Sequence, residues 1–277
     1  MTEDIHNPAV DPESGLGAVR GIQPVVRRRG TGEPVVYLQA AHLSGRWLPL
    51  HVELAQRHDL VVPEHPGFAG GERPTWLDDF SDLAIYYDEL LDTLELDRVH
   101  LVGHSLGGWI AAEFAAFYPR RLKSLTLIAP MGLRVPGHPI HDIFRMTDED
   151  AGSLLLNDDG AAYDRLGMTP TSLDARVEAY DDLTTLARLM WNPRYALKLD
   201  ERLDRVRCPA LLIAPDEDRI VPAAHIERWS ELLPDARVEK VTGTASPTGH
   251  LLVVQEPERA AAAISSFVAG VDRSTVS

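Results

Sequence analysis

The sequence predicts an α/β fold in which a mostly parallel β-sheet is flanked by helices and carries a helical insertion. Three observations support this fold class. Short apolar runs rich in Val, Leu and Ile alternate with longer helical patterns. Several runs are nearly continuously apolar, as expected for strands that are buried on both faces. One long section contains helical patterns but no convincing strand, and it therefore reads as an insertion.

The expected strands coincide with six apolar runs. Because these runs alternate with helices, we expect parallel strands joined by right-handed crossovers. The runs are PVVYLQA (34–40), HDLVVPEH (58–65), RVHLVGH (98–104), LKSLTLIAP (122–130), CPALLIAP (208–215) and ARVEKVTG (236–243).

Helical patterns fill most of the gaps between these runs. In 76–96 the apolar residues recur close to the period of 3.6 residues that is typical of an amphipathic helix. The stretch 106–119 is rich in Ala and ends at a proline, which stops a helix. Two further helices are expected at 222–233 and 256–270.

These patterns divide the chain into three parts. Residues 1–21 have no periodicity and predict a loose N-terminal arm. Residues 22–132 and 206–277 form the predicted α/β core, and 133–205 form a helical cap or lid. The segment 141–182 contains eleven acidic and three basic residues. Such a section is typical of a solvated surface, and it can at the same time cover the strand ends as a lid.

Composition limits the possible partners. The chain has 277 residues and a net charge of −15, which argues against binding to nucleic acid or to an anionic membrane surface. Its single cysteine, Cys208, excludes an intrachain disulfide. The N-terminal residues do not resemble a secretory signal and no apolar run is long enough to span a membrane. We therefore expect a cytoplasmic protein, monomeric or homodimeric, that acts on a small molecule.

The stretch LVGHSLGGW at 101–109 carries the strongest functional signal. It fits the pattern G-x-S-x-G, with a strand before it and an apolar helix after it, as a nucleophile elbow requires. The elbow presents Ser105 on a tight turn, and the N–H of Leu106 at the start of the helix can donate to an oxyanion. A serine can also simply cap a helix, but a cap does not need glycine on both sides.

A nucleophilic serine needs a base, and the base needs an acid that orients it. Among the eleven histidines, His250 stands on a loop after the last strand. For the acid, the loop after CPALLIAP offers Asp216 and Asp218 just beyond a strand end. Asp218 is the first choice and Asp216 the alternative. The order Ser, Asp, His along the chain is typical of this architecture.

These motifs resemble those of the α/β-hydrolase superfamily over about residues 22–270. The resemblance rests on GHSLGG, PEHPGFAGGERP (63–74), APDEDRIVP (214–222) and GHLLVVQEPERAAAAISSF (249–267). It implies an eight-stranded, mostly parallel sheet with an insertion after the sixth strand. It also implies Ser105 as nucleophile, His250 as base and Asp218 as orienting acid.

The chain departs from the family in the loop after PVVYL. Members of the family usually carry His-Gly there, and the next residue donates the second oxyanion-hole N–H. This chain has Gln39 and Ala40, which places Ala41 at the donor position. We expect the N–H of Ala41 to donate. Two alternatives are that the side chain of Gln39 or His42 enters the site, or that the oxyanion hole is defective.

Together these residues predict a serine hydrolase that cleaves a small or medium carboxylic ester through an acyl-enzyme intermediate. One alternative is hydrolysis of a carbon–carbon bond in a diketone-type substrate by the same triad. Another is a non-catalytic binding protein on the same fold. No metal or other cofactor is expected. Apolar cap residues, among them Phe144 and Trp191, are candidates for the substrate pocket, and the acidic cap favours a neutral or cationic ester.

Overall fold

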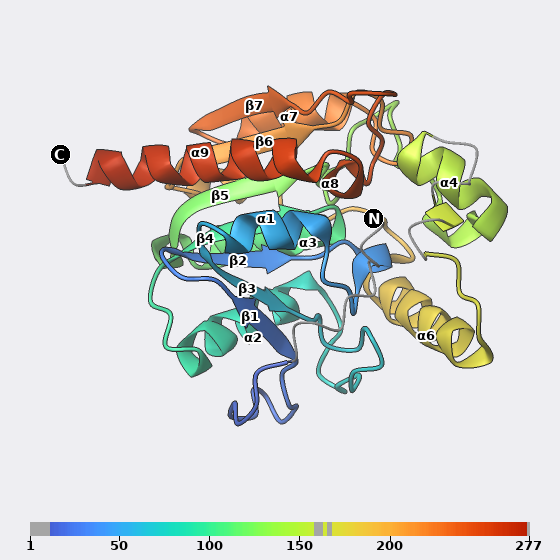
Figure 1. The fold of residues 1–277 in the computed structure, drawn as a ribbon, viewed down its shortest axis with the longest axis horizontal. Helices are drawn as coiled ribbons and strands as arrows, with labels where there is room; N and C mark the ends of the chain where they lie inside the picture. Colours follow the sequence, from blue (N-terminus) through green and yellow to red (C-terminus); the bar gives the residue numbers. More distant parts are fainter. Residues whose placement is uncertain (1–11, 158–162, 165–167, 276–277) are drawn as a thin grey trace.

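One sheet of seven strands runs through the computed structural model of the protein, which describes residues 12–157, 163–164 and 168–275 (Figure 1). The strand order is β1-β3-β2-β4-β5-β6-β7. β1 pairs with β3 in the antiparallel sense, and the other neighbouring pairs are parallel. The strands are β1 (Val26–Arg29), β2 (Pro34–Leu38), β3 (Asp59–Pro63), β4 (Val99–His104), β5 (Leu122–Ile128), β6 (Ala210–Ala214) and β7 (Ala236–Lys240).

The predicted α/β class with a mostly parallel sheet is confirmed, but the expected number of eight strands is wrong for the described residues. The chain before β1 turns back on itself too tightly to form another strand. Val19 and Ile22 make a single isolated bridge around Arg20 and Gly21, and both of these central residues have positive φ. The insertion consequently follows the fifth strand of the sheet, not the sixth.

Helices cover both faces of the sheet. Figure 1 shows α1 (Pro49–Ala55) and α9 (Pro257–Thr275) in front of it, and α3 (Leu106–Phe117) and α7 (Ala224–Leu232) behind it. α2 (Phe80–Thr93) packs against α3, and the short α8 (Leu252–Gln255) packs against α9. The four helices predicted for the core are therefore α2, α3, α7 and α9, while α1 and α8 were not predicted.

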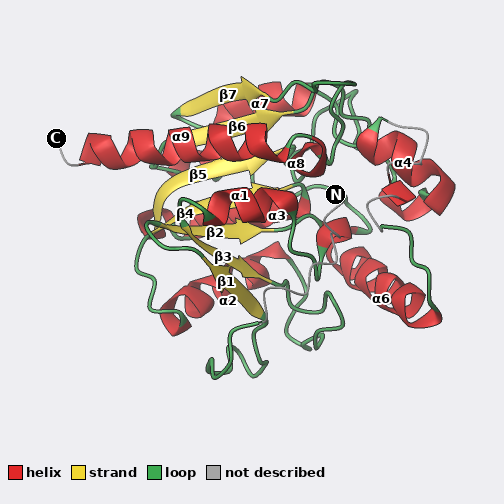
Figure 2. Cartoon of the chain, viewed as in Figure 1, coloured by secondary structure: helices red, strands yellow, loops and turns green. Residues whose placement is uncertain are grey.

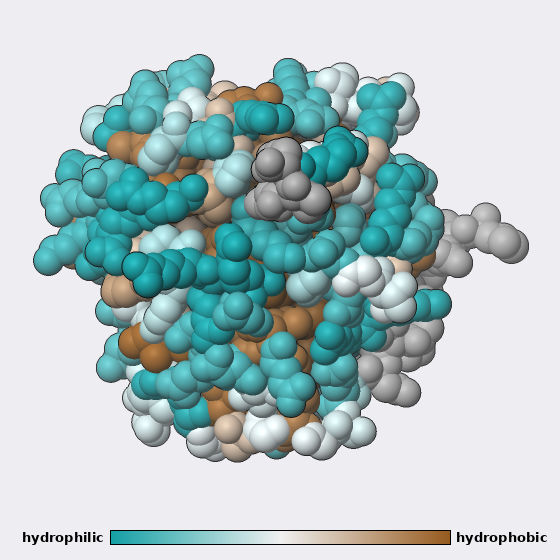
Figure 3. Space-filling view, turned by 90° about the vertical axis from the view of Figure 1, so that its left-hand side faces the viewer, coloured by the Kyte–Doolittle hydropathy of each residue, from teal (hydrophilic) through white to brown (hydrophobic). Residues whose placement is uncertain are grey.

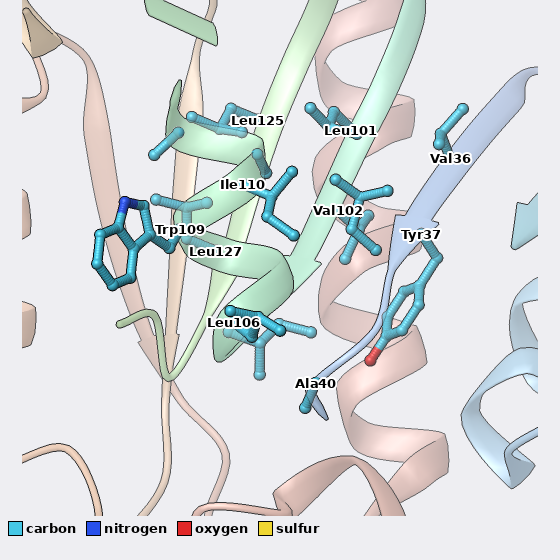
Figure 4. Close-up of a cluster of buried hydrophobic side chains, with 14 of the residues drawn as sticks. Val36, Tyr37, Ala40, Leu101, Val102, Leu106, Trp109, Ile110, Leu125 and Leu127 are labelled. Atoms are coloured by element: carbon cyan, nitrogen blue, oxygen red, sulfur yellow. The ribbon is translucent and has the colours of Figure 1, made fainter. Parts of the chain in front are cut away.

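The centre of the sheet is buried on both faces. All six residues of β4 are buried, as the apolar run RVHLVGH predicts. Figure 4 shows side chains of β2, β4, β5 and α3 gathered in one apolar cluster, with Leu106 and Ala40 close to its lower edge. This packing fixes where β4 ends and α3 begins, and it thereby places the residue between them.

The segment between β5 and β6 forms a layer of its own. We refer to residues 133–205 as the cap, and their described part contains helices but no strand. Figure 2 shows α4 and α6 at the end of the sheet toward which the parallel strands point. The cap elements are η3 (Ile143–Arg145), α4 (Asp148–Leu156), α6 (Leu173–Met190) and η4 (Leu203–Arg205).

The end of the molecule opposite the cap has a mainly hydrophilic surface. Figure 3 views the side at the amino ends of the parallel strands, where hydrophilic side chains cover most of the surface. Among the described helices, none is both long and apolar enough to cross a membrane. The carboxyl ends of the strands, beneath the cap, are therefore the place to look for a site.

The buried sheet predicts a clear contrast between two leucines. Leu212 of β6 is fully buried, whereas Leu197 in the cap is 71% exposed. Leu212→Ala should lower the free energy of unfolding by about 2–5 kcal/mol because it leaves a cavity in the core. Leu197→Ala removes the same atoms and should change it by less than about 0.5 kcal/mol. Urea unfolding of both variants checks this, and equal effects would contradict the described burial.

Candidate active site

Ser105 lies between the end of β4 and the start of α3, on a strained turn. Its φ is 54° and its ψ is −111°, a conformation that costs a non-glycine residue free energy. The turn is held by a hydrogen bond from the N–H of Ser105 to the carbonyl of Ile128, 2.9 Å long. The carbonyl of Ser105 accepts from Trp109 and Met131. The surrounding backbone thus stabilises the strained residue at the carboxyl end of the sheet.

The glycines around Ser105 permit close backbone contacts. A Cβ atom on Gly103 would lie 2.3 Å from the carbonyl oxygen of Gly107. A Cβ atom on Gly107 would lie 2.1 Å from the carbonyl oxygen of Leu38 in β2. Neither glycine has a positive φ, so the motif needs them for space and not for conformational freedom. The G-x-S-x-G spacing therefore lets β4, α3 and β2 approach one another.

Ser105, His250 and Asp218 form a chain of hydrogen bonds. The hydroxyl of Ser105 lies 2.7 Å from Nε2 of His250, and Nδ1 of His250 lies 2.8 Å from Oδ2 of Asp218. The other carboxylate oxygen of Asp218 accepts from the N–H groups of Ile220 and Val221, each at 2.8 Å. All three side chains are buried. The structure thus brings together the three residues that the sequence analysis selected.

The alternative acid, Asp216, does not contact His250. Its carboxylate accepts from the N–H groups of Gly243 and Thr248, at 2.9 and 3.1 Å. Lys240 lies 3.3 Å from its other oxygen. Asp216 therefore fixes the loop that leads to His250, while Asp218 contacts the imidazole itself.

His104 forms a hydrogen bond to the backbone of His250, a contact that the sequence did not predict. Its Nε2 lies 2.9 Å from the carbonyl oxygen of His250. Because a carbonyl oxygen only accepts, this nitrogen carries the proton. Burial lowers the pKa of His104 to about 3, so the ring is neutral. His104, which precedes Ser105 in the motif, thus holds the backbone of His250, and the side chain of His250 contacts Ser105.

The loop after β2 is joined to the start of α3. The carbonyl oxygen of Gln39 accepts from the N–H of Gly107 at 3.1 Å and from Nε2 of His65 at 2.9 Å. Nδ1 of His65 then accepts from the hydroxyl of Tyr87. Burial lowers the pKa of His65 to about 4, although the carbonyl of Gln39 opposes this shift. The motif PEHP therefore supplies a neutral imidazole that positions this loop.

A second buried group supports the same loop from the side. Glu64 accepts from the N–H of Gly45 at 3.0 Å and forms an ion pair with Arg27. The side-chain amide of Gln39 lies 3.4 Å from Glu64. Burial raises the pKa of Glu64, while Gly45 and Arg27 act in the opposite direction. The polar residue at position 39 is thus part of a buried network.

Ala41 and Leu106 flank the space beside Ser105. Ala40 has φ −72° and ψ 152°, an ordinary extended conformation, so the loop does not require glycine at this position. Ala41 and Leu106 both line the small cavity at Ser105. Among the described residues, no protein acceptor takes up the N–H of either residue. Their side of the cavity is therefore free to receive an oxygen atom.

The small cavity adjoins a larger one beneath the cap. The pocket at Ser105 has a volume of about 10 Å³, and its walls include Ile143 and Leu186 of the cap. The larger cavity has a volume of about 560 Å³. Ala41, Ile143 and Leu186 line both cavities, so the two meet at the loop beside Ser105.

The remaining predicted pocket residues lie elsewhere. Gln39 is buried and faces Glu64, and it does not line either cavity. The rings of Phe144 and Trp191 pack against each other with centroids 5.0 Å apart, and Trp191 is 59% exposed. Trp191 lines a separate hollow on the cap. The side chain of His42 lies outside the described part of the structure.

Asp182 of α6 is a charged residue of the larger cavity that the sequence analysis did not select. Its Oδ1 accepts from the N–H of Ala69 at 2.9 Å, and Thr185, almost one turn later, donates to the carbonyl of Gly67 at 2.9 Å. These bonds hold the cap to the core. Burial raises the pKa of Asp182 to about 7, and the neighbouring acid Glu178 contributes to this shift. An acidic side chain on a helix gives no sequence signal for such burial.

One group of described side chains could approach a metal ion, but it lies far from Ser105. Ligand atoms of Glu33, His100 and Asp272 lie within 4.8 Å of one another. His100 lies near the amino end of β4, whereas Ser105 follows its carboxyl end, so this group lies at the opposite end of the strand. The ammonium group of Lys123 already pairs with Glu33. We therefore assign no metal to the site at Ser105.

Known proteins resemble the chain over most of its length. A family model described as the alpha/beta hydrolase fold matches residues 33–257. A protein of Caulobacter sp. (strain K31) with the provisional name carbamate hydrolase RutD is 30% identical over 92% of this chain and 98% of its own. The 2-hydroxy-6-oxo-2,4-heptadienoate hydrolase of Pseudomonas putida is 24% identical over 91% of this chain and 95% of its own.

A solved structure shows the same fold. The chain superposes on a membrane phospholipase A, described as a bacterial virulence factor, with a TM-score of 0.78. The two share 21% sequence identity, and the match covers 95% of this chain and 87% of that one. At this identity the likeness concerns the fold alone.

The close approach at Gly107 predicts a strong effect of one added methyl group. Gly107→Ala should lower the free energy of unfolding by about 1–3 kcal/mol, because its Cβ would meet backbone that cannot easily move. In Gly270→Ala the Cβ meets no atom within 4 Å, and the substitution should raise stability by about 0.5–1 kcal/mol as alanine favours a helix. Chemical unfolding of both variants checks this, and a neutral Gly107→Ala would refute the contact.

The raised pKa of Asp182 predicts how stability changes with pH. Because the folded state favours the protonated form, the wild type should lose stability as pH rises from about 4 through 7. Asp182→Asn keeps an oxygen that can accept from Ala69 and should escape this loss. Its stability relative to the wild type should therefore increase by about 1–3 kcal/mol between pH 5 and 8, after allowance for solvent screening.

Urea unfolding at several pH values measures this difference. Asp181→Asn removes the adjacent, exposed carboxylate and serves as the control, for which we expect no comparable trend. A difference between Asp182→Asn and the wild type that stays constant from pH 5 to 8 would show that Asp182 does not titrate abnormally.

Proposed function

The chain belongs to the alpha/beta hydrolase fold family and is a hydrolase, and we propose that it cleaves a small or medium carboxylic ester through an acyl-enzyme intermediate. One observation carries this proposal: the hydroxyl of Ser105, the imidazole of His250 and the carboxylate of Asp218 form a continuous chain of hydrogen bonds of 2.7 and 2.8 Å. The serine also faces a cavity that extends beneath the cap.

In the first half of the reaction, the oxygen of Ser105 attacks the carbonyl carbon of the ester. His250 accepts the serine proton on Nε2, and the C=O double bond opens to a tetrahedral oxyanion. When the oxyanion collapses, the bond to the alcohol breaks and His250 returns the proton to the departing oxygen. The acyl group is then bound to Ser105 as an ester.

In the second half, a water molecule takes the place of the alcohol. His250 removes a proton from the water as its oxygen attacks the acyl carbon, and it gives that proton to the oxygen of Ser105. The acid is released and the serine is restored. Asp218 keeps Nδ1 of His250 protonated and stabilises the imidazolium that forms in each half. No step requires a metal or another cofactor.

The oxyanion requires hydrogen-bond donors that are in place before it forms. We assign this role to the N–H groups of Leu106 and Ala41, which flank the cavity at Ser105. The bond from Gly107 to the carbonyl of Gln39 holds the two donors in a fixed relation. The extended conformation of Ala40 supports this assignment over a defective oxyanion hole.

Carbon–carbon bond hydrolysis is the second candidate, because the relative from Pseudomonas putida is named for such a substrate. The same triad can attack a ketone carbonyl, after which a carbanion leaves instead of an alkoxide. The name of the Caulobacter relative adds carbamates, whose carbonyl carbon is open to the same attack. The chain is a hydrolase, which argues against the alternative of a non-catalytic binding protein.

The expected type of substrate, the oligomeric state and the location in the cell remain predictions. We expect a small-molecule substrate, a monomer or homodimer, and a cytoplasmic location.

Substitution of the nucleophile tests the proposed function. Ser105→Ala should lower kcat/KM for short-chain nitrophenyl esters by at least about 10³-fold, because the covalent route is lost. Ser266→Ala, an exposed serine on α9, is the matched control and should stay within about twofold of the wild type. A fluorophosphonate probe should label the wild type and not Ser105→Ala.

The substrate panel should contain an ester, a carbamate and a diketone-type ring-fission product. Ester hydrolysis that persists in folded Ser105→Ala would overturn the serine mechanism. Turnover of the diketone-type substrate alone, lost in Ser105→Ala, would favour the second candidate over the first.

A further inference from the structure

Acidic side chains outnumber basic ones in the described lining of the larger cavity beneath the cap. Among the described residues, its charged lining consists of the partly buried Asp182 and the exposed Glu178, both on α6, and Arg46 on the core. Within the described residues, neither of the two carboxylates forms an ion pair. Oδ1 of Asp182 accepts from Ala69, and Oδ2 has no hydrogen-bond partner among these residues. The cavity thus contains carboxylate groups that a ligand could neutralise.

The helix places these carboxylates at defined distances from Leu186, a residue of the small cavity. Leu186 lines the small cavity together with Ser105 and His250. Asp182 precedes Leu186 by about one helical turn and Glu178 by about two, which corresponds to roughly 6 and 12 Å along the axis. Residues four apart share one face of a helix, so these three side chains form a row that leads away from Ser105.

The acidic neighbours of Asp182 make its ionisation less favourable. The acids Glu178, Asp181 and Glu64 all act on Asp182 in the same sense. Arg46 is the single basic residue in the described cavity lining, and it leaves the lining with a net negative charge when both carboxylates are ionised. Asp182 is partly buried and forms no ion pair with a described residue, so its ionisation is costly, and a bound cation would offset that cost.

Building on the proposed serine-hydrolase function, we propose that the cavity selects esters whose part remote from the scissile bond carries a cationic group, held by Asp182 and Glu178. The cation would lie one to two helical turns from the reacting carbonyl, which corresponds to a spacer of a few carbon atoms. An anionic substrate would instead meet both carboxylates. The cavity therefore favours a cationic ester over an acid such as a dienoate.

Titration of Asp182 makes the preference for a cationic ester depend on pH. Since burial raises the pKa of this carboxyl to about 7, it is largely protonated at pH 5.5 and largely ionised at pH 8.5. The preference for a cation should accordingly be weak at low pH and strong at high pH. An uncharged ester shares the pH dependence of the catalytic step, so the ratio of the two rates isolates the contribution of the cavity.

The test uses pairs of esters that differ only in charge. Choline butyrate is paired with 3,3-dimethylbutyl butyrate, and the methyl ester of 4-trimethylammoniobutanoate with methyl 5,5-dimethylhexanoate. The first pair places the charge on the alcohol and the second on the acyl group. In at least one pair, kcat/KM for the cationic ester should exceed that for its neutral isostere by at least about tenfold at pH 8.5. Monomethyl glutarate, an anionic ester, should be the poorest substrate.

Asp182→Asn keeps an acceptor for Ala69 but removes the charge, and it should lower the cationic-to-neutral ratio by about tenfold. Glu178→Gln should lower it in the same direction. Asp181→Asn changes the net charge equally but lies outside the cavity lining, and it should change the ratio by less than about twofold at pH 8.5, where Asp182 is already largely ionised. In the wild type alone, the ratio should rise between pH 5.5 and 8.5, which tests the inference without any variant.

The outcomes separate this inference from the proposed function. If none of the esters is turned over by a Ser105-dependent route, the proposed function itself fails. If esters are turned over but both ratios stay near one at pH 8.5, or the anionic ester is preferred, the function stands and the cation selectivity is overturned. A tenfold preference that Asp181→Asn abolishes and Asp182→Asn retains would also overturn it.

Discussion

The hydrogen bond from the N–H of Gly107 to the carbonyl of Gln39 is the contact on which the rest of the site depends. It joins the start of α3, which follows Ser105, to the loop that begins the opposite wall of the cavity. The bond is possible because position 107 lacks a side chain, so that α3 can approach β2 at van der Waals distance. His65 donates to the same carbonyl and fixes its direction. The strained turn at Ser105 and the loop at Ala41 are therefore held as one rigid unit.

The two aspartates after β6 contact different parts of the segment that carries His250. Asp216 binds the backbone of the segment that leads to His250, whereas Asp218 binds its imidazole. Their side chains are two positions apart, yet they contact different parts of the histidine loop. His104 adds a third support through the carbonyl of His250. The imidazole is thus fixed at its ring and at its backbone, and its direction toward Ser105 does not depend on a single contact.

The fold class and the three residues of the hydrogen-bonded chain could be predicted because each leaves a local signal. Buried parallel strands are continuous apolar runs, and Ser105 stands between glycines at a strand end. The extra strand was wrong because a two-residue turn at Arg20 and Gly21 replaces it, a feature that an aperiodic segment does not reveal. Phe144 and Trp191 pack on each other and line neither cavity, since an apolar pattern cannot show which neighbour a side chain will meet. Asp182 was missed because acidic residues on a helix usually face water.

The carboxylate of Asp182 lies at the boundary between two parts of the molecule. It accepts a hydrogen bond from the core at Ala69, it belongs to the helix that covers the cavity, and it lines the cavity itself. An ionised carboxylate is a stronger acceptor than a protonated one. The charge state inside the cavity and the strength with which the cap is fastened to the core are therefore thermodynamically linked. Any ligand that stabilises the ionised form also tightens this fastening, so occupancy and closure reinforce each other.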